Sequence, residues 1–402
     1  MGESAEDSDM IVQNRMTGTL KGIWLNLPIF YSVYTILSSA VLSMAYFNPS
    51  RTVYLLSALL PLFWIFCYVL ASQYAEVGSA DRVGHVHLSL KRAVLAAGSM
   101  IVILIALALI VKPVTQNNIV VDIQAYYPSA IVSNDGGVTD GSGNSLYDKN
   151  GVGLAQNALL TTSDGREWRL EGTVLVDVAQ KRALIGFYEI INVVWMLLFL
   201  AHCLQYRRLH GVIRFFGAAL LYGFLLESGG VLSGFFTEND YHVYFPFLAA
   251  PMVTMLGWPM VFYCVVCIWE RLTARWETLM KCNAALSGIA ISLIALCWDL
   301  NVDPAATGLG LWTWNAALPA WFLGVPLVNF TSWFSAVFSF GAGYTLVMRS
   351  KWSERKKTAA MFAVIPILLI VSAVINFLIC GFAEGFDGPS WTVLTAYLHA
   401  IM

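Results

Sequence analysis

Long apolar stretches alternate with short polar ones along most of the chain, and they set its predicted architecture. A helix that crosses the hydrocarbon core of a bilayer needs about 20 consecutive, mainly apolar residues. We predict nine such helices, at residues 23–46, 53–74, 93–112, 183–204, 215–236, 244–269, 282–300, 326–348 and 360–382. A broken segment joins the seventh to the eighth, and it could re-enter the membrane instead of leaving it. The pattern predicts an all-α polytopic membrane protein.

The segment between the third and fourth predicted helices follows another pattern. Within residues 113–181, the stretches NIVVDIQAYY and WRLEGTVLVDV alternate apolar and polar positions, as half-buried β-strands do. A loop rich in Gly, Asn and Asp separates them. We predict a small β-rich insertion here. The chain then divides into a tail with three helices (1–112), the insertion (113–181), a core (182–350) and a last helix with a tail (351–402).

Lys and Arg residues occur in alternate loops, and this predicts the orientation. They follow the second, fourth, sixth and eighth predicted helices, whereas loops 236–243 and 301–325 contain none. Loops rich in Lys and Arg usually face the cytoplasm. We therefore expect a multi-pass protein of the cytoplasmic membrane with its N-terminus inside and its C-terminus outside. The same rule makes the insertion extracytoplasmic.

The composition is that of a membrane protein, and the sequence lacks the motifs of disulfide-rich, metal-binding and nucleotide-binding proteins. Hydrophobic residues make up 58% of the chain and charged residues only 12%, compared with about 25% charged residues in soluble domains. None of the seven cysteines lies in the insertion, so no disulfide framework is predicted. Cys264 and Cys267 have the spacing of a zinc-binding pair but no second ligand pair, so we predict no metal site. The chain has no phosphate-binding or nucleotide-binding motif, and we expect no cofactor.

The segment from Cys297 to Trp333 carries the most unusual residues. It holds Asp299, Asp303 and Asn329, and it contains no Lys or Arg. Carboxyl groups in or near a bilayer are costly to keep, which makes them candidates for function. Several Pro and Gly residues break the backbone of this segment. Such irregular backbone is tolerated at membrane depth only inside the protein or around a cavity.

The predicted orientation brings these residues to one level. Glu227 lies in the outer half of the fifth predicted helix, and Asp299 and Asp303 lie at the outer end of the seventh. Asn329 lies in the outer part of the eighth. We therefore predict a polar site in the outer half of the membrane.

Each candidate also has a structural interpretation. Asp303 precedes Pro304, an arrangement typical of a helix N-cap with Pro at the first helical position. Glu227 lies among small residues that allow close packing of helices, so it could hydrogen-bond to a neighbouring helix. Trp312 and Trp314 could belong to the aromatic belt at the membrane interface.

Two blocks of residues carry a further signal. The downstream block consists of Asp299, Asp303, Pro304, Gly310, Trp312, Trp314, Gly324, Val325, Pro326, Leu327, Asn329, Phe330 and Trp333. The upstream block consists of Glu227, Gly230, Ser233, Gly234, Phe235, Tyr244, Pro251 and Trp258. Over roughly residues 182–350, the chain resembles the carotenoid-biosynthesis membrane family, which includes the gamma-carotene and bisanhydrobacterioruberin hydratases. The resemblance implies a cofactor-independent enzyme that hydrates the end group of a lycopene-like polyene. It also implies a carotenoid or other long isoprenoid, membrane lipid and other carotenoid-pathway enzymes as partners, and no nucleic acid.

The residue types suit this chemistry independently. Hydration of a trisubstituted alkene needs a proton donor, a group that stabilises a tertiary cation and a positioned water molecule. A carboxyl group in an apolar site keeps its proton and can donate it, which suits Glu227, Asp299 and Asp303 as catalytic residues. An indole face stabilises a nearby cation by about 2 kcal/mol in a dry site. We expect substrate-binding roles for Trp258, Trp312, Trp314, Trp333 and Asn329.

Three other functions remain compatible with these residues. A membrane terpene cyclase would use the same acids and aromatic residues but exclude water from the cation. A proton-coupled transporter would place carboxyl groups near the middle of the membrane, usually in paired broken helices. A non-catalytic assembly partner of other pigment enzymes is the third alternative.

Overall fold

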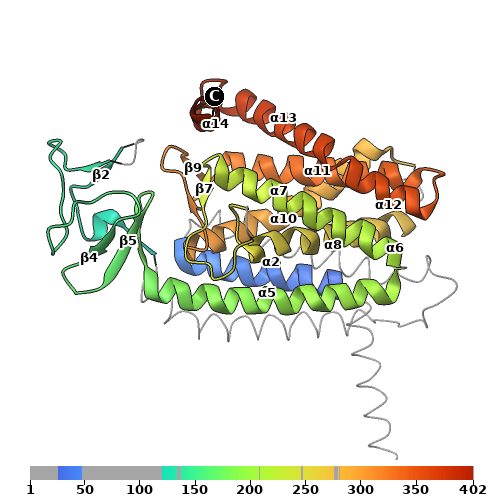
Figure 1. The fold of residues 1–402 in the computed structure, drawn as a ribbon, viewed down its shortest axis with the longest axis horizontal. Coiled ribbons are helices and arrows are strands. Elements are labelled where there is room, and N and C mark those ends of the chain that lie inside the picture. Colours follow the sequence, from blue (N-terminus) through green and yellow to red (C-terminus); the bar gives the residue numbers. More distant parts are fainter. Residues whose placement is uncertain are drawn as a thin grey trace, which may run out of the picture.

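A bundle of long helices carries a small β unit at one end (Figure 1). The computed structural model describes residues 26–47, 120–133, 137–207, 209–245, 248–275, 279 and 281–401. The predicted helices at 53–74 and 93–112 lie outside these described residues, as does most of the N-terminal tail.

Helices occur at the other seven predicted positions. They are α2 (Leu27–Phe47), α5 (Val178–Tyr206), α7 (Ala218–Leu232), α8 (Met252–Arg275), α10 (Ala284–Gly308), α11 (Leu327–Arg349) and α13 (Ile365–Glu384). A short helix, α6 (Leu209–Val212), and a π-helical turn (Ile213–Gly217) lead into α7. Within the described residues, five segments are long and apolar enough to cross a membrane: Val178–Gln205, Leu209–Leu232, Met252–Thr273, Ala284–Gly308 and Ile365–Glu384. The predicted number of nine membrane helices is therefore not confirmed.

Helix α11 shows why a helix of the bundle can fall outside these five. It packs most extensively against α10 and α13, and its polar side chains contact those neighbours. Thr331 Oγ1 lies 2.5 Å from Asn376 Oδ1 and 3.2 Å from Cys380 Sγ, both on α13. Helices that associate inside a membrane use such small and polar residues for close packing. Its Thr, Ser and Asn residues lower the hydropathy of α11.

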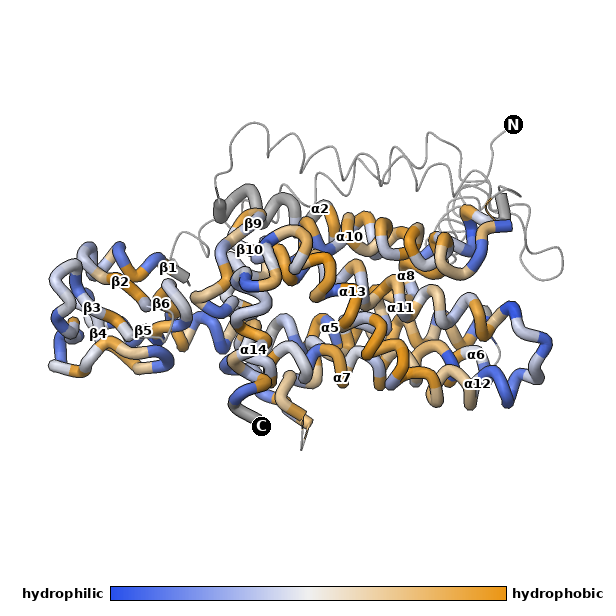
Figure 2. The backbone as a smooth tube through the Cα atoms, turned by 90° about the horizontal axis from the view of Figure 1, so that it is seen from above, coloured by the Kyte–Doolittle hydropathy of each residue, from blue (hydrophilic) through white to orange (hydrophobic). Residues whose placement is uncertain are grey.

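The bundle has an apolar surface along its length and hydrophilic residues at its two ends. Ile367, Ile370 and Phe382 on α13 are exposed, as expected for side chains in contact with lipid. Hydrophilic residues collect at the two ends, one at the β unit and the other near α6 and α12 (Glu354–Ala363) (Figure 2). At the second end, Arg214 Nη1 forms an ion pair with Glu354 Oε2 at 2.8 Å. Which side of the membrane this end faces stays a prediction.

The insertion forms the β unit. Strands β1 (Val120–Asp122), β4 (Leu159–Thr161), β5 (Glu167–Glu171) and β6 (Val174–Asp177) form an antiparallel sheet in the order β1-β6-β5-β4. A two-stranded sheet of β2 (Ile131–Val132) and β3 (Val138–Thr139) accompanies it. The segment NIVVDIQAYY is only partly a strand. Asp122 Oδ1 accepts a hydrogen bond from the backbone N–H of Gln124 at 2.8 Å, which caps a 3-10 turn after β1. Trp168 is fully buried in the core of this unit.

The segment after residue 300 differs from its predicted form. Helix α10 continues to Gly308, so Asp303 and Pro304 lie inside a helix and the N-cap interpretation of Asp303 is wrong. Beyond it, β8 (Thr313–Trp314) pairs with β7 (Phe236–Thr237). A hairpin of β9 (Ala320–Phe322) and β10 (Val325–Pro326) then leads into α11. The C-terminal tail also contains an unpredicted helix, α14 (Pro389–Ile401).

Candidate active site

A cavity of about 440 Å³ lies within the helical bundle, near the end that carries the β unit. Residues of α2, α5, α7, α8, α10 and α11 line it, together with the segment that holds β8. Its volume is typical of small-molecule sites, which span roughly 300–1,000 Å³. Most of the lining is apolar or aromatic. Polar side chains interrupt it: Thr35, Ser39, Asn192, Glu227, Thr254, Asp303, Asn329 and Ser332.

Asp299, Asp303 and Asn329 form one hydrogen-bonded group. The two aspartates are four residues apart on α10 and therefore share a helix face. Asn329 Nδ2, on α11, donates to Asp299 Oδ1 at 2.9 Å and to Asp303 Oδ2 at 2.5 Å. The other carboxyl oxygens, Asp299 Oδ2 and Asp303 Oδ1, have no hydrogen-bond partner in the described part of the chain. Asp303 lines the cavity, whereas Asp299 is fully buried one helical turn away and does not.

Glu227 lines the same cavity from α7. The indole Nε1 of Trp258, on α8, donates a hydrogen bond to Glu227 Oε2 at 2.6 Å. The Trp258 ring lies 4.9 Å from the Trp333 ring, measured between centroids. Glu227 is also close enough to Asp303 for their charges to interact. Carboxyl groups from two different helices, Glu227 of α7 and Asp303 of α10, therefore meet at one cavity.

The predicted tryptophans lie around these acids. Trp258, Trp312, Trp314 and Trp333 all line the cavity. Trp314 Nε1 donates to Thr307 Oγ1 at 3.0 Å, which fixes that indole against the last turn of α10. These four rings are therefore placed where they can contact a ligand.

A second aromatic group was missed by sequence reasoning. Tyr31 of α2 packs against Trp195 and Phe199 of α5 and Trp298 of α10, with ring centroids 4.6, 5.0 and 5.5 Å apart. Tyr31, Trp195 and Trp298 line the cavity. Aromatic residues in an apolar helix are unremarkable individually, so the sequence held no signal that these would meet.

The loop between α7 and α8 contributes a further acid that the sequence did not single out. Glu238 is only 5% exposed, and its Oε2 accepts a hydrogen bond from Thr254 Oγ1 at 3.4 Å. Burial raises the pKa of Glu238 well above its ordinary value, and the negative charge of Glu227 raises it further. Glu189 lies differently, because its Oε1 and Oε2 accept hydrogen bonds from the backbone N–H and the ring Nδ1 of His242.

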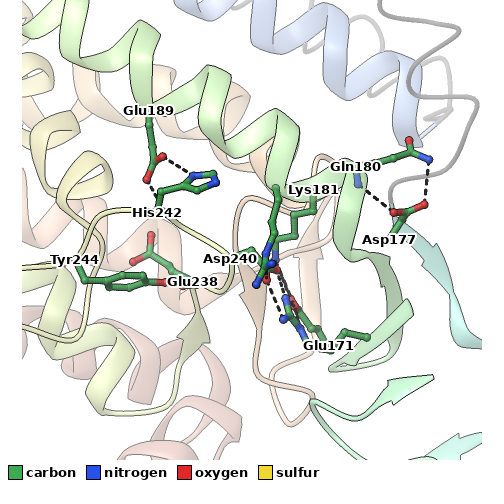
Figure 3. Close-up of polar contacts among 11 residues, drawn as sticks. Glu171, Asp177, Gln180, Lys181, Glu189, Glu238, Asp240, His242 and Tyr244 are labelled. Atoms are coloured by element: carbon green, nitrogen blue, oxygen red, sulfur yellow. Dashed lines mark hydrogen bonds and ion pairs between the residues drawn. The ribbon is translucent and has the colours of Figure 1, made fainter. Parts of the chain in front are cut away.

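A buried ionic cluster joins the β unit to the bundle beside the cavity (Figure 3). Lys181 Nζ, on α5, lies 3.1 Å from Glu171 Oε2, and Thr313 Oγ1 donates to the same oxygen at 2.7 Å. Arg169 forms an ion pair with Asp240 of the loop before α8. Burial raises the pKa of the Glu171 carboxyl, but the charges of Lys181 and Arg169 outweigh it and hold that pKa below its ordinary value. The cluster fixes the β unit and two loops over one end of the bundle.

Metal-binding side chains do not gather in the described residues. No group of three His, Cys, Asp or Glu residues that could hold a metal ion occurs there. Cys264 and Cys267 are free cysteines in the middle of α8. The site therefore presents carboxyl, amide and indole groups to a ligand.

Residues 185–398 match the family model described as carotenoid biosynthesis protein. This region covers more than half of the 402 residues and includes every predicted site residue. It also continues past residue 350, where the resemblance seen in the sequence ends, through α13 and most of α14. Searches of curated proteins and of solved structures found no match.

Proposed function

The chain belongs to the carotenoid biosynthesis protein family, and we propose that it is a membrane enzyme that adds water to a terminal isoprenoid double bond of a lycopene-like polyene. The observation that carries this proposal is the meeting of Asp303, Glu227 and Asn329 with four indole rings at one cavity. An apolar cavity with a few convergent polar groups is the usual form of a small-molecule site. Its size suits one end group of a polyene.

The proton comes from the aspartate pair. Two buried carboxylates side by side would repel each other, so the pair is expected to retain a proton, as other close carboxyl pairs do. Asp303 lines the cavity and is the donor in our proposal. The proton forms a C–H bond at the less substituted alkene carbon, and the π bond breaks to leave a tertiary cation. Asp299 and Asn329 hold Asp303 in position and share its charge afterwards.

The indole rings stabilise the cation. A cation within about 6 Å of an indole face gains roughly 2 kcal/mol when water is excluded. Trp333 and Trp258 lie against each other next to the acids, and Trp312 and Trp314 supply further faces. The cation therefore forms among groups that attract it without reacting with it.

Water then reacts with the cation, and Glu227 accepts the released proton. The oxygen forms a C–O bond, one hydrogen stays as the hydroxyl, and the other passes to the Glu227 carboxylate. The hydrogen bond from Trp258 Nε1 favours the charged form of Glu227 and so supports its role as a base. The product is the alkene plus one water. Proton exchange restores both carboxyl groups.

The mass of the product tests this proposal. Membranes that contain the protein are supplied with a lycopene-type polyene in ¹⁸O-labelled water. We expect a product heavier by one labelled water, with formation dependent on the protein. A cyclised isomer of unchanged mass would instead identify a terpene cyclase. Unchanged polyene, together with ion-coupled proton flux in liposomes, would identify a transporter.

A further inference from the structure

Glu238 is a buried acid that the proposed reaction leaves without a role. It lies in the loop between β7 and α8, and its exposure is 5%. Its Oε1 has no hydrogen-bond partner, and no Lys or Arg forms an ion pair with it, among the residues that the structure describes. A buried carboxyl group without a counter-ion favours its protonated form. Glu238 therefore holds a proton that it can exchange.

On one side, Glu238 contacts a residue of the cavity lining. Thr254, which donates to Glu238 Oε2, is itself part of the cavity lining. Among the carboxyl groups, Glu227 is the one whose negative charge raises the pKa of Glu238. Tyr188 and Tyr241 also interact with both acids. On a path from the cavity towards the loop before α8, Glu238 therefore follows Glu227.

On the other side, the same loop reaches solvent. Two residues after Glu238, Asp240 joins the ionic cluster, where it lies 3.8 Å from Lys181 and 3.6 Å from Arg182. The Arg182 side chain is 63% exposed. Figure 3 shows Glu238, Asp240 and His242 following one another along this loop beside the start of α5. Glu238 therefore lies between the cavity and the solvated end of the bundle.

We propose that Glu238 carries protons between Glu227 and the aqueous face at this end of the molecule. Glu238 releases its proton towards solvent and then takes the proton that Glu227 has received from water. One proton leaves Glu227 and one emerges at the surface, so the charge balances without any other reactant. The need for this path rests on the proposed function, but the path itself can be measured without any hydration.

Glutamine is the informative replacement at this position. A protonated Glu and a Gln have nearly the same shape, and both donate and accept hydrogen bonds. A purely structural role would therefore survive Glu238→Gln, whereas proton transfer would not. Glu189→Gln is the matched control, because Glu189 lies at the same end and contacts His242 instead of the cavity.

Infrared spectroscopy of the full-length protein in lipid vesicles measures the path directly. The protonated carboxyl band of Glu227 is assigned as the band that Glu227→Gln removes in mildly acidic buffer. After transfer to heavy water, we expect this band to exchange at least about tenfold more slowly in Glu238→Gln, equivalent to about 1.4 kcal/mol in activation free energy. The exchange rate in Glu189→Gln should equal that of the wild type.

Turnover supplies the second measurement. If hydration occurs, Glu238→Gln should lower it by a similar factor, and formate should restore part of the loss in Glu238→Ala. Unchanged exchange of the Glu227 band in Glu238→Gln would overturn the relay, even where hydration itself is confirmed. Slowed exchange in a protein that hydrates no polyene would support the relay and reject the proposed function.

Discussion

Asp303 and Asp299 contact the same amide, but they meet the cavity unequally. Only Asp303 lines it, and Asn329 Nδ2 lies 2.5 Å from its Oδ2. Asp303→Asn preserves size and hydrogen bonding but removes the proton. We therefore expect turnover to fall by roughly 10²–10⁴-fold, the range for general acid–base catalysis.

Asp299→Asn should cause a smaller fall in turnover, because Asp299 acts through Asp303. Glu227→Gln should match Asp303→Asn, since it removes the proton acceptor.

The measurement for these three variants is hydrated product per immunodetected protein in membranes. Equal membrane accumulation shows that a loss belongs to chemistry and not to folding. Near-normal turnover in any one of them would remove that residue from the mechanism. A loss in Asp299→Asn as large as that in Asp303→Asn would indicate that Asp299 supplies the proton.

The tryptophans allow a graded test of the cation. Replacement of Trp312, Trp314 or Trp333 by Phe retains a weaker aromatic face, whereas Leu retains only bulk and apolarity. We expect turnover per protein to decrease from Trp to Phe to Leu at one or more of these positions. Trp258→Phe should lower turnover per protein more than the other Phe variants do, because it also removes the hydrogen bond to Glu227. Equal turnover across the series would leave the cation without its proposed stabiliser.

At the scale of elements, the contact between α7 and α8 sets the position of Trp258. A Cβ atom added at Gly223 on α7 would lie 2.5 Å from Trp258 Cβ, closer than real contacts allow. Because Trp258 Cβ is fixed to its backbone, the two helices must separate, and this moves the indole relative to Glu227. We expect Gly223→Ala to lower both turnover and thermal stability. Gly229→Ala is the control on the same helix, because its Cβ would meet no atom within 4 Å.

The same scale shows what sequence could reveal about the fold. Long apolar stretches predicted the helices well, since a bilayer demands uninterrupted apolar length. The end of α10 was missed because Asp303-Pro304 is typical of a helix start. In the structure Pro304 lacks an N–H for the carbonyl of Leu300, and α10 nevertheless runs on for four more residues. Such breaks are tolerated where neighbouring helices surround the segment.

Sequence alone could select those candidate residues whose type is unusual for their depth in the membrane. Carboxyl groups in apolar stretches stand out, so Glu227, Asp299 and Asp303 were selected, and the structure places Glu227 and Asp303 in the cavity lining. Glu238 was missed because acids in loops are common, and its burial depends on packing against α8. Tyr31 was missed for a similar reason: only the assembled bundle brings α2 beside α5 and α10.

At the scale of the whole molecule, the ionic cluster couples the β unit to the bundle and makes that coupling dependent on pH. The pKa of Glu171 in the folded protein lies below its ordinary value of 4.5. Its ionised form therefore stabilises the folded state above about pH 4.5, and this stabilisation is lost as the pH falls through the lowered pKa. We expect the protection factors of the β5 and β6 amide hydrogens, which compare each exchange rate with the intrinsic rate at the same pH, to decrease below that pH.

Glu171→Gln should give the same loosening at neutral pH, because it weakens the pairing of the fully buried Lys181. Removing one partner of a buried ion pair costs roughly 3–5 kcal/mol. Glu167→Gln, at an exposed position of the same strand, should change neither the exchange nor its pH dependence. Amide exchange in Glu171→Gln that equals the wild type at every pH would show that the cluster does not hold the β unit.

The two ends of the molecule differ in charge, and this difference should set its orientation in the membrane. The basic residues after α5, α8 and α11 gather at one end, where Arg207 pairs with Glu270 and Arg214 with Glu354. The β unit lies at the other end (Figure 1), and the cavity is lined by Trp312 and Trp314, which precede and follow Thr313 of the ionic cluster at that end. Ser142 is exposed in the β unit, and Ser353 is exposed immediately before α12. We predict that a cysteine at Ser142 faces outward and one at Ser353 faces the cytoplasm.

Labelling of intact cells with a membrane-impermeant maleimide checks this orientation. Ser142→Cys should react in intact cells, whereas Ser353→Cys should react only after the membrane is permeabilised. The unsubstituted protein is the control for native cysteines, because Cys282, near the same end as Ser353, is half-buried. The reverse labelling would place the cavity and Glu238 towards the cytoplasm. The proton released through Glu238 would then enter the cytoplasm instead of leaving the cell, although the acids would keep their geometry around the cavity.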